Sequence, residues 1–175
     1  MSASTPQPIT NVPELLAHAL ELESESRERY RDLAKGMSLH NNPDVAALFE
    51  QMAAYSELHA RSVQVRAQGY ALPEIAPWDF KWSCPEGRET PCLDDVHYLM
   101  NRRQALELAR HNEIRAREFY AQVARESPDS QVSALAREMA EEEREHVNLL
   151  AQWISREPVS AESLLEDLDP PHLPE

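Results

Sequence analysis

Apolar residues recur at alternating spacings of three and four along four long stretches of the chain, which is the pattern of a helix that buries one face. Ala, Leu, Glu and Arg, which are good helix formers, dominate these stretches. Only three glycines occur, and the 13 prolines fall mostly between or beyond the stretches. The pattern predicts an all-α fold in which four helices pack their apolar stripes together as a bundle.

Capping residues set the expected limits of these helices. Asn followed three residues later by Glu or Gln opens a helix, as does Pro at the first helical position, while Gly marks a helix end. On these signals the helices are expected over Val12 to Gly36, Asn42 to Gly69, Asn101 to Glu126, and Ser127 to Arg156.

The segments outside the helices differ in character. The aromatic residues Trp78, Phe80 and Trp82 lie in the connection between the second and third helices, so we expect this connection to be a strap packed along the bundle. The last segment is acidic and contains Pro, so we expect it to be mobile. The expected divisions are a flexible N-terminus at 1–11, a bundle at 12–156 with its strap at 70–100, and a tail at 157–175.

Each predicted stripe carries a polar residue near its middle. The first and third stripes contain Glu23 and Glu113, each seven residues before a Tyr. The second and fourth contain His59 and His146, and the fourth also contains Glu143. The two halves of the chain repeat, because the two single glutamates lie 90 residues apart and the two histidines 87. We therefore expect all five side chains at a similar depth in the bundle.

This set of side chains favours a metal site. An ionised carboxylate in an apolar core is costly unless a cation or hydrogen bonds compensate it. Glu143 and His146 lie three residues apart on one helix face, so both can bind the same ion, and Glu23 and Glu113 can reach that ion from neighbouring helices. Two other interpretations stay open. The glutamates could pair with Arg in the core, and His59 and His146 could be hydrogen-bonded core histidines.

Two segments, Glu23–Tyr30 and Glu113–Tyr120, followed by Glu143-Arg-Glu-His146, resemble the rubrerythrin-type branch of the ferritin-like di-iron carboxylate proteins. The resemblance covers residues 12–156. It implies an antiparallel four-helix bundle with one long crossover between the second and third helices. It also implies a di-iron centre built from one Glu on each of two helices and Glu-x-x-His on each of the other two.

The resemblance also assigns roles to residues of this chain. It implies that two glutamates are the single carboxylate ligands of their helices and that two histidines are the imidazole ligands. It also implies that one further Glu bridges the metals. The implied ligands, in that order, are Glu23 and Glu113, His59 and His146, and Glu143.

The second helix departs from the family pattern. Ser56 stands where a Glu is expected three residues before His59, and Glu57 lies on a face turned by about 100°. Two metals could still bind with water or hydroxide in the sixth place, or the second half could retain one metal, iron or another divalent ion. Glu57 could replace the missing carboxylate only if the helix bulges locally.

Charge and composition restrict the partners. The chain has 175 residues, with 17 Lys and Arg against 31 Asp and Glu, which gives a formal net charge of −14. Without a basic block, nucleic acid is not an expected partner. No segment approaches the ~20 apolar residues of a membrane span, and no secretory leader is recognisable, so we expect no membrane association and a cytoplasmic location.

Two cysteines and two tyrosines complete the candidate residues. Cys84 and Cys92 have the wrong spacing for a redox or metal motif, so we expect reduced thiols. Rubrerythrins proper carry a rubredoxin module that passes electrons to the di-iron site, and this sequence shows none, so a separate protein is the expected electron donor. Tyr30 and Tyr120 are expected to pack in the core, with hydrogen bonding to the metal ligands or radical quenching as the alternative.

Two functions follow from this sequence. The first is a di-iron protein that reduces hydrogen peroxide or dioxygen, or oxidises iron, with an external electron donor. The second is a degenerate bundle that binds one metal or none and serves as a structural or partner-binding protein. Bundles of this type commonly pair through exposed apolar faces, so a homodimer is an expectation to test.

Overall fold

The computed structural model describes residues 8–76, 80 and 98–158. These contain four helices and no strand, which confirms the all-α prediction and the ferritin-like four-helix bundle. Trp78, Trp82, both cysteines and the tail from residue 159 lie outside the described residues. The helices are α1 (Val12–Leu39), α2 (Pro43–Arg66), α3 (Arg102–Glu126) and α4 (Ser130–Arg156).

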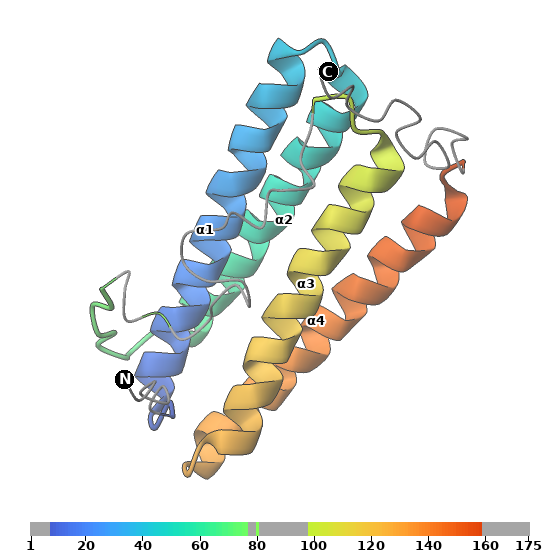
Figure 1. The fold of residues 1–175 in the computed structure, drawn as a ribbon. Helices are drawn as coiled ribbons and strands as arrows, with labels where there is room; N and C mark the ends of the chain where they lie inside the picture. Colours follow the sequence, from blue (N-terminus) through green and yellow to red (C-terminus); the bar gives the residue numbers. More distant parts are fainter. Residues whose placement is uncertain (1–7, 77–79, 81–97, 159–175) are drawn as a thin grey trace, which may run out of the picture.

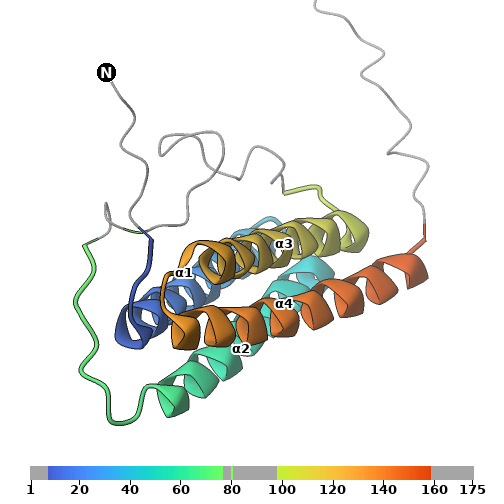
Figure 2. The ribbon, with the colours of Figure 1, turned by 90° about the horizontal axis from the view of Figure 1, so that it is seen from below.

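The bundle consists of two helical hairpins. Helices α1 and α2 pack closely along their length, as do α3 and α4, and the two hairpins meet through α2 with α3 and α1 with α4. Figures 1 and 2 show that the partners in each hairpin run in opposite directions. Because α3 begins at the end of the bundle opposite to the end of α2, these two helices run the same way, so the connection between them is the long crossover that the sequence predicts.

Three predicted helix limits need correction. Gly36 does not end α1, which continues to Leu39. The added turn buries Met37, and Asn41 adopts the positive φ of 58° that reverses the chain. Helix α2 ends at Arg66, before Gly69, whose φ of 88° belongs to the turn that follows.

The fourth helix begins later than predicted because a different residue caps it. Asp129 accepts hydrogen bonds from the backbone N–H groups of Gln131 and Val132, at 2.8 and 3.0 Å, which makes it the N-cap. Ser127, the predicted start, instead follows the last residue of α3. The cap predicted for α3 is confirmed, because Asn101 and Gln104 form a reciprocal capping box.

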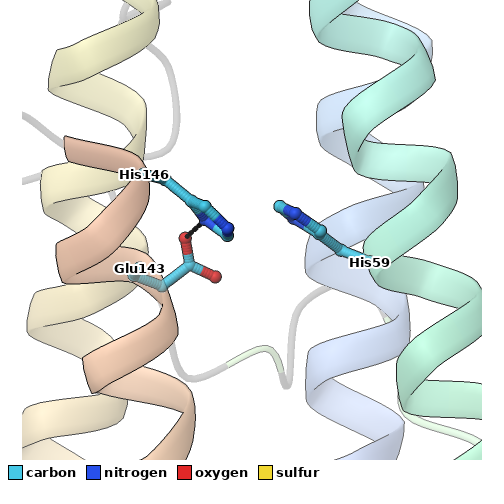
Figure 3. Close-up of side chains that lie close together, drawn as sticks. All are labelled: His59, Glu143 and His146. Atoms are coloured by element: carbon cyan, nitrogen blue, oxygen red, sulfur yellow. Dashed lines mark hydrogen bonds and ion pairs between the residues drawn. The ribbon is translucent and has the colours of Figure 1, made fainter. Parts of the chain in front are cut away.

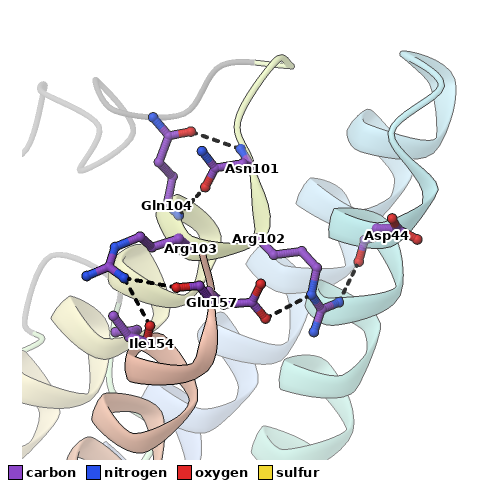
Figure 4. Close-up of polar contacts among 7 residues, drawn as sticks. All are labelled: Asp44, Asn101, Arg102, Arg103, Gln104, Ile154 and Glu157. Atoms are coloured by element: carbon purple, nitrogen blue, oxygen red, sulfur yellow. Dashed lines mark hydrogen bonds and ion pairs between the residues drawn. The ribbon is translucent and has the colours of Figure 1, made fainter. Parts of the chain in front are cut away.

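The start of α3 fastens one end of the bundle (Figure 4). Arg102 donates to the backbone carbonyl of Asp44 at the start of α2 and to the carboxylate of Glu157 beyond α4, at 3.2 Å each. Arg103 donates to the backbone carbonyl of Ile154 at 3.1 Å, which satisfies a carbonyl in the last turn of α4. These contacts tie three helices together where the crossover returns.

The core is divided into two apolar clusters with a polar layer between them. One cluster lies towards the α1–α2 turn and includes Tyr30, Phe49 and Leu106. The other lies towards the α3–α4 turn and includes Leu16 and Val132. The polar residues singled out in the sequence lie between the clusters along the chain, so apolar packing on both sides fixes the helices that carry them.

The N-terminal segment is tied to the bundle at one point. Ile9, which the sequence analysis places in a flexible segment, is 2% exposed and packs in the second core cluster. Of the strap at 70–100, residues 70–76, 80 and 98–100 are described, and the ring of Phe80 lies 6.0 Å from the ring of His18 between centroids. No helix of the described residues has the length and apolarity needed to cross a membrane.

Candidate metal centre

The polar layer brings together the five side chains that the sequence places at equal depth. Three contacts among these side chains each join an imidazole to a carboxylate through the Nδ1 atom of the ring. His59 on α2 lies 3.6 Å from Glu23 on α1, and His146 on α4 lies 3.4 Å from Glu113 on α3. His146 also lies 3.0 Å from Glu143, one turn earlier on the same helix. All four helices therefore contribute to one cluster.

The two imidazole rings meet across the bundle. His59 and His146 stack with their centroids 4.1 Å apart and their planes at 11°. Figure 3 shows the two rings pointing towards each other from facing helices, with Glu143 beside His146. Potential ligand atoms of these three residues all lie within 4.8 Å of one another, which is close enough for one metal ion to contact all of them.

The carboxylates of this cluster are withdrawn from water. The side chains of Glu23 and Glu143 are each 6% exposed, and that of Glu113 is 20% exposed. Both imidazoles are 28% exposed, so they form the accessible side of the cluster. Buried carboxylates at this density are costly unless protons or cations are bound between them.

The direction of each pKa shift indicates how bound protons offset the carboxylate charges when no metal is present. Burial raises the pKa of Glu143, and the nearby Glu113 adds to the rise. Burial also acts to raise the pKa of Glu113, but hydrogen bonds with His146 and Glu143 outweigh burial and leave this pKa below its ordinary value. Burial acts to lower the pKa of His146, but hydrogen bonds to Glu113 and Glu143 raise it to about 10. These shifts favour the ionised form of Glu113 and the protonated forms of Glu143 and His146.

Glu23 belongs to the other half of the cluster. Burial raises its pKa, and the hydrogen bond with His59 offsets only part of the rise. In both halves a ring nitrogen thus lies close to a buried carboxylate oxygen, at 3.6 Å between His59 and Glu23 and at 3.0 Å between His146 and Glu143. Carboxylate oxygens and imidazole nitrogens together suit iron, manganese or zinc, so this donor set fits a metal centre.

Comparison with known proteins identifies the family. The rubrerythrin family model matches residues 14–75 and 104–168, which include every residue of the cluster. The chain belongs to the rubrerythrin family. It is also similar to an uncharacterized conserved protein from Magnetospirillum magnetotacticum MS-1, with 41% sequence identity and a TM-score of 0.65. That similarity covers 86% of this chain and 98% of the other. No curated protein matches the chain.

Ser56, which departs from the rubrerythrin sequence pattern, lies at the corresponding inward position of α2 in the structure. Ser56 is 5% exposed and lines a cavity together with His59, Glu113 and His146, so it occupies the inward position that Glu143 occupies in the other half. Ser56 points to the side that a regular helix gives to its position, because α2 is a continuous α-helix through this region.

Glu57 does not replace the missing carboxylate. It lies 2.9 Å from Arg27 of α1 and 3.4 Å from Arg61, one turn later on α2. The Arg27 guanidinium lowers the pKa of Glu57, so this carboxylate is held as an ion on the outside of the first hairpin. The bulge that would turn Glu57 inward is absent from the described part of α2.

Two cavities adjoin the cluster on its accessible side. One, of about 210 Å³, has mostly apolar walls and contains Ser56. The other, of about 200 Å³, is lined mainly by polar residues, among them Glu23, Glu142 and Glu145. Both are lined by His59 and His146, so small molecules in either cavity reach the imidazole pair.

A hydrogen bond beside the cluster was missed by the sequence analysis. Asn112 donates to the hydroxyl of Tyr30 at 3.2 Å, next to Glu113. Burial and the charge of Glu113 raise the pKa of Tyr30, so the hydroxyl stays protonated at ordinary pH. Asn112 gives no signal in the sequence, because it follows no stripe and its partner lies on another helix.

Proposed function

We propose that this protein is a di-iron member of the rubrerythrin family that reduces hydrogen peroxide or dioxygen, or oxidises iron, with a separate electron-donor protein. The proposed metal ligands are Glu23, His59, Glu113, Glu143 and His146. Two ferrous ions, when bound, supply two electrons to an oxidant without a second cofactor.

One observation carries the proposal. Two imidazoles from different hairpins stack at 4.1 Å, and each directs its Nδ1 atom at a buried carboxylate. A core that needed only packing would not place two rings and three carboxylates in contact, because each buried charge must be compensated. The family assignment and the cluster of His59, Glu143 and His146 support the same conclusion.

The protein's own residues would do three things in this reaction. The buried Glu23 and Glu143 would hold cations out of bulk water. The cavities beside His59 and His146 would admit a small oxidant. Tyr30, whose hydroxyl is held by Asn112, would keep a protonated phenol near Glu113.

The test is a single-turnover reaction. Protein loaded anaerobically with ferrous ion is mixed with peroxide or with dioxygen, and the absorption of the oxidised iron is followed with time. We expect rapid oxidation in the native protein and a loss of at least tenfold in rate for Glu143→Gln, which removes a charged ligand but keeps the volume. Equal rates in the two proteins would contradict the proposal.

A second candidate function rests on Ser56 and Glu57. One inward position holds Ser56, and the adjacent carboxylate is bound to Arg27, so the first half offers one carboxylate fewer than the second. A degenerate bundle with one metal or none, serving as a structural or partner-binding protein, would follow. It predicts fewer than two irons per chain and no oxidant turnover in the native protein.

A further inference from the structure

The cavity beside Ser56 differs from an ordinary gap in a bundle. It measures about 210 Å³, which exceeds the ~150 Å³ that accommodates a benzene-sized molecule in a protein core. Its floor consists of Ser56, His59, Glu113 and His146, and its walls are apolar. Leu149, at the edge, is 40% exposed, so the cavity reaches the surface beside this residue.

The charges of the buried cluster beside this cavity do not balance when two divalent ions are bound. Glu23, Glu113 and Glu143 bring three negative charges, and the two ions bring four positive ones. One positive charge remains among the buried groups, and an uncompensated charge there is costly. The two further carboxylates beside the cluster, in the polar cavity, lie outside this count, because Glu142 pairs with Arg66 and Glu145 is exposed. The described residues that line the cavity include no further carboxylate, and Glu57 is held by Arg27.

We propose that a small monocarboxylate with a short apolar chain binds in this cavity and supplies the fourth carboxylate of the loaded centre. The proposal rests on the di-iron function above, because a single divalent ion would leave the site negative and would repel an anion. The carboxylate head lies over the floor, where the hydroxyl of Ser56 can donate to it and where a glutamate side chain would otherwise fill the space.

The walls determine which carboxylate fits. Tyr55 on α2 and Trp153 on α4 meet where the two hairpins pack together, with ring centroids 6.2 Å apart. Met52, Leu149 and Leu150 complete the apolar lining. An inorganic anion would leave these apolar surfaces against water. Each buried methylene improves affinity about fourfold, so an acid of about four carbons, with two methylenes more than acetate, should bind about fifteenfold more tightly than acetate.

The experiment measures the binding of ferrous ion by anaerobic equilibrium dialysis of the full chain, in a buffer free of carboxylates. Butyrate is the probe, acetate is the control for the length of the alkyl group, and 1-butanol is the control for the charge of the carboxylate. We expect butyrate to raise the affinity for the second ion about tenfold, acetate to raise it less and butanol to leave it unchanged. By reciprocity the metal raises the affinity for butyrate by the same factor, which calorimetry measures separately.

Two variants locate the effect. Ser56→Glu supplies the carboxylate from the chain and should abolish the response to butyrate, whereas Gln64→Glu, which adds the same charge at an exposed position of α2, should retain it. Leu149→Gln, at the exposed edge of the cavity, should reduce the advantage of butyrate over acetate and keep the response to acetate. This variant tests the cavity even if Ser56→Glu does not fold.

The outcomes separate this inference from the proposed function. Two ions bound with equal affinity with and without butyrate would overturn the monocarboxylate and leave the di-iron centre. Fewer than two ions under both conditions would overturn both. Equally tight binding of butyrate to the metal-free protein would overturn the charge argument on which the inference rests.

Discussion

His59 and His146 stack ring on ring although they belong to different hairpins, with their centroids 4.1 Å apart. Each ring also directs Nδ1 at a carboxylate of its own hairpin, Glu23 in the first and Glu143 in the second. The contact between hairpins at this depth is therefore a contact between two matching halves of one polar cluster. Compensation of its charges, by protons or by metal ions, is expected to govern both stability and function.

The substitution Ser56→Glu should change the stability of the protein in opposite directions with and without metal. In the metal-free protein it buries a further carboxylate beside Glu113, so we expect the free energy of unfolding to fall by about 2 kcal/mol. In the metal-saturated protein the new carboxylate balances the cations, so we expect a gain. Denaturant unfolding under both conditions measures this, with Gln64→Glu as the control. A loss under both conditions would contradict the account.

Glu57 should have no part in metal binding. Its carboxylate is bound to Arg27 and Arg61 on the outside of the first hairpin. We therefore expect Glu57→Gln to retain the metal content of the native protein, in contrast to Glu143→Gln. Elemental analysis of both variants, purified in parallel, measures this. Loss of metal from Glu57→Gln would show that this carboxylate turns inward when metal binds.

The metal-free protein should lose stability as the pH rises. The folded-state pKa of His146 is raised from 6.5 to about 10, so its contribution is complete below pH 6.5 and is lost as the pH rises towards 10. The pKa of Glu143 is also raised, which gives the same sign. Urea unfolding of chelator-treated protein across this range should show the decline, and His146→Gln should flatten it. Stability that rises over this range would contradict the assigned protonation.

The hydroxyl of Tyr30 should matter for stability more than for metal content. Tyr30 is 1% exposed, stacks near Phe49 at 6.0 Å between centroids and accepts a hydrogen bond from Asn112. We expect Tyr30→Phe to lower the free energy of unfolding by about 1 kcal/mol, and a double-mutant cycle with Asn112→Ala to assign that loss to the hydrogen bond. Unchanged stability with lost metal would instead place Tyr30 in support of Glu113.

The fold and the cluster could be predicted because both depend on helical phase. Glu23 and Glu113 lie on their stripes by the spacing of three and four, and the repeat of the halves places His59 and His146 at the same depth. Such periodicity is a local property, so a single sequence is sufficient to read it. Ser56 was assigned its inward position on the same basis.

Features that depend on contacts between helices could not be predicted. Glu57 is fixed by Arg27, which is 30 residues away and on another helix. The apolar cavity exists because Tyr55 and Trp153 meet across the bundle. His18 is 1% exposed beside Phe119, and its position three residues after Leu15 is the signal in the sequence for this burial.

Helix ends were predicted less accurately than helix positions because caps compete with packing. Gly36 is a good helix terminator, but one more turn buries Met37 and allows Asn42 to donate to the backbone carbonyl of Met100 at 2.7 Å. Packing thus favours continuation over the local stop signal. The same competition shows how the α1–α2 turn becomes attached to the start of α3.

The count of iron per chain tests the central claim most directly. Protein produced with added iron is analysed for its metal content, and the visible spectrum of the oxidised sample is recorded. The account predicts about two irons per chain and the absorption of an oxo-bridged pair, both lost in Glu143→Gln. One metal or none in the native protein would contradict the account, because the cluster of Glu23, His59, Glu113, Glu143 and His146 would then be compensated by protons alone.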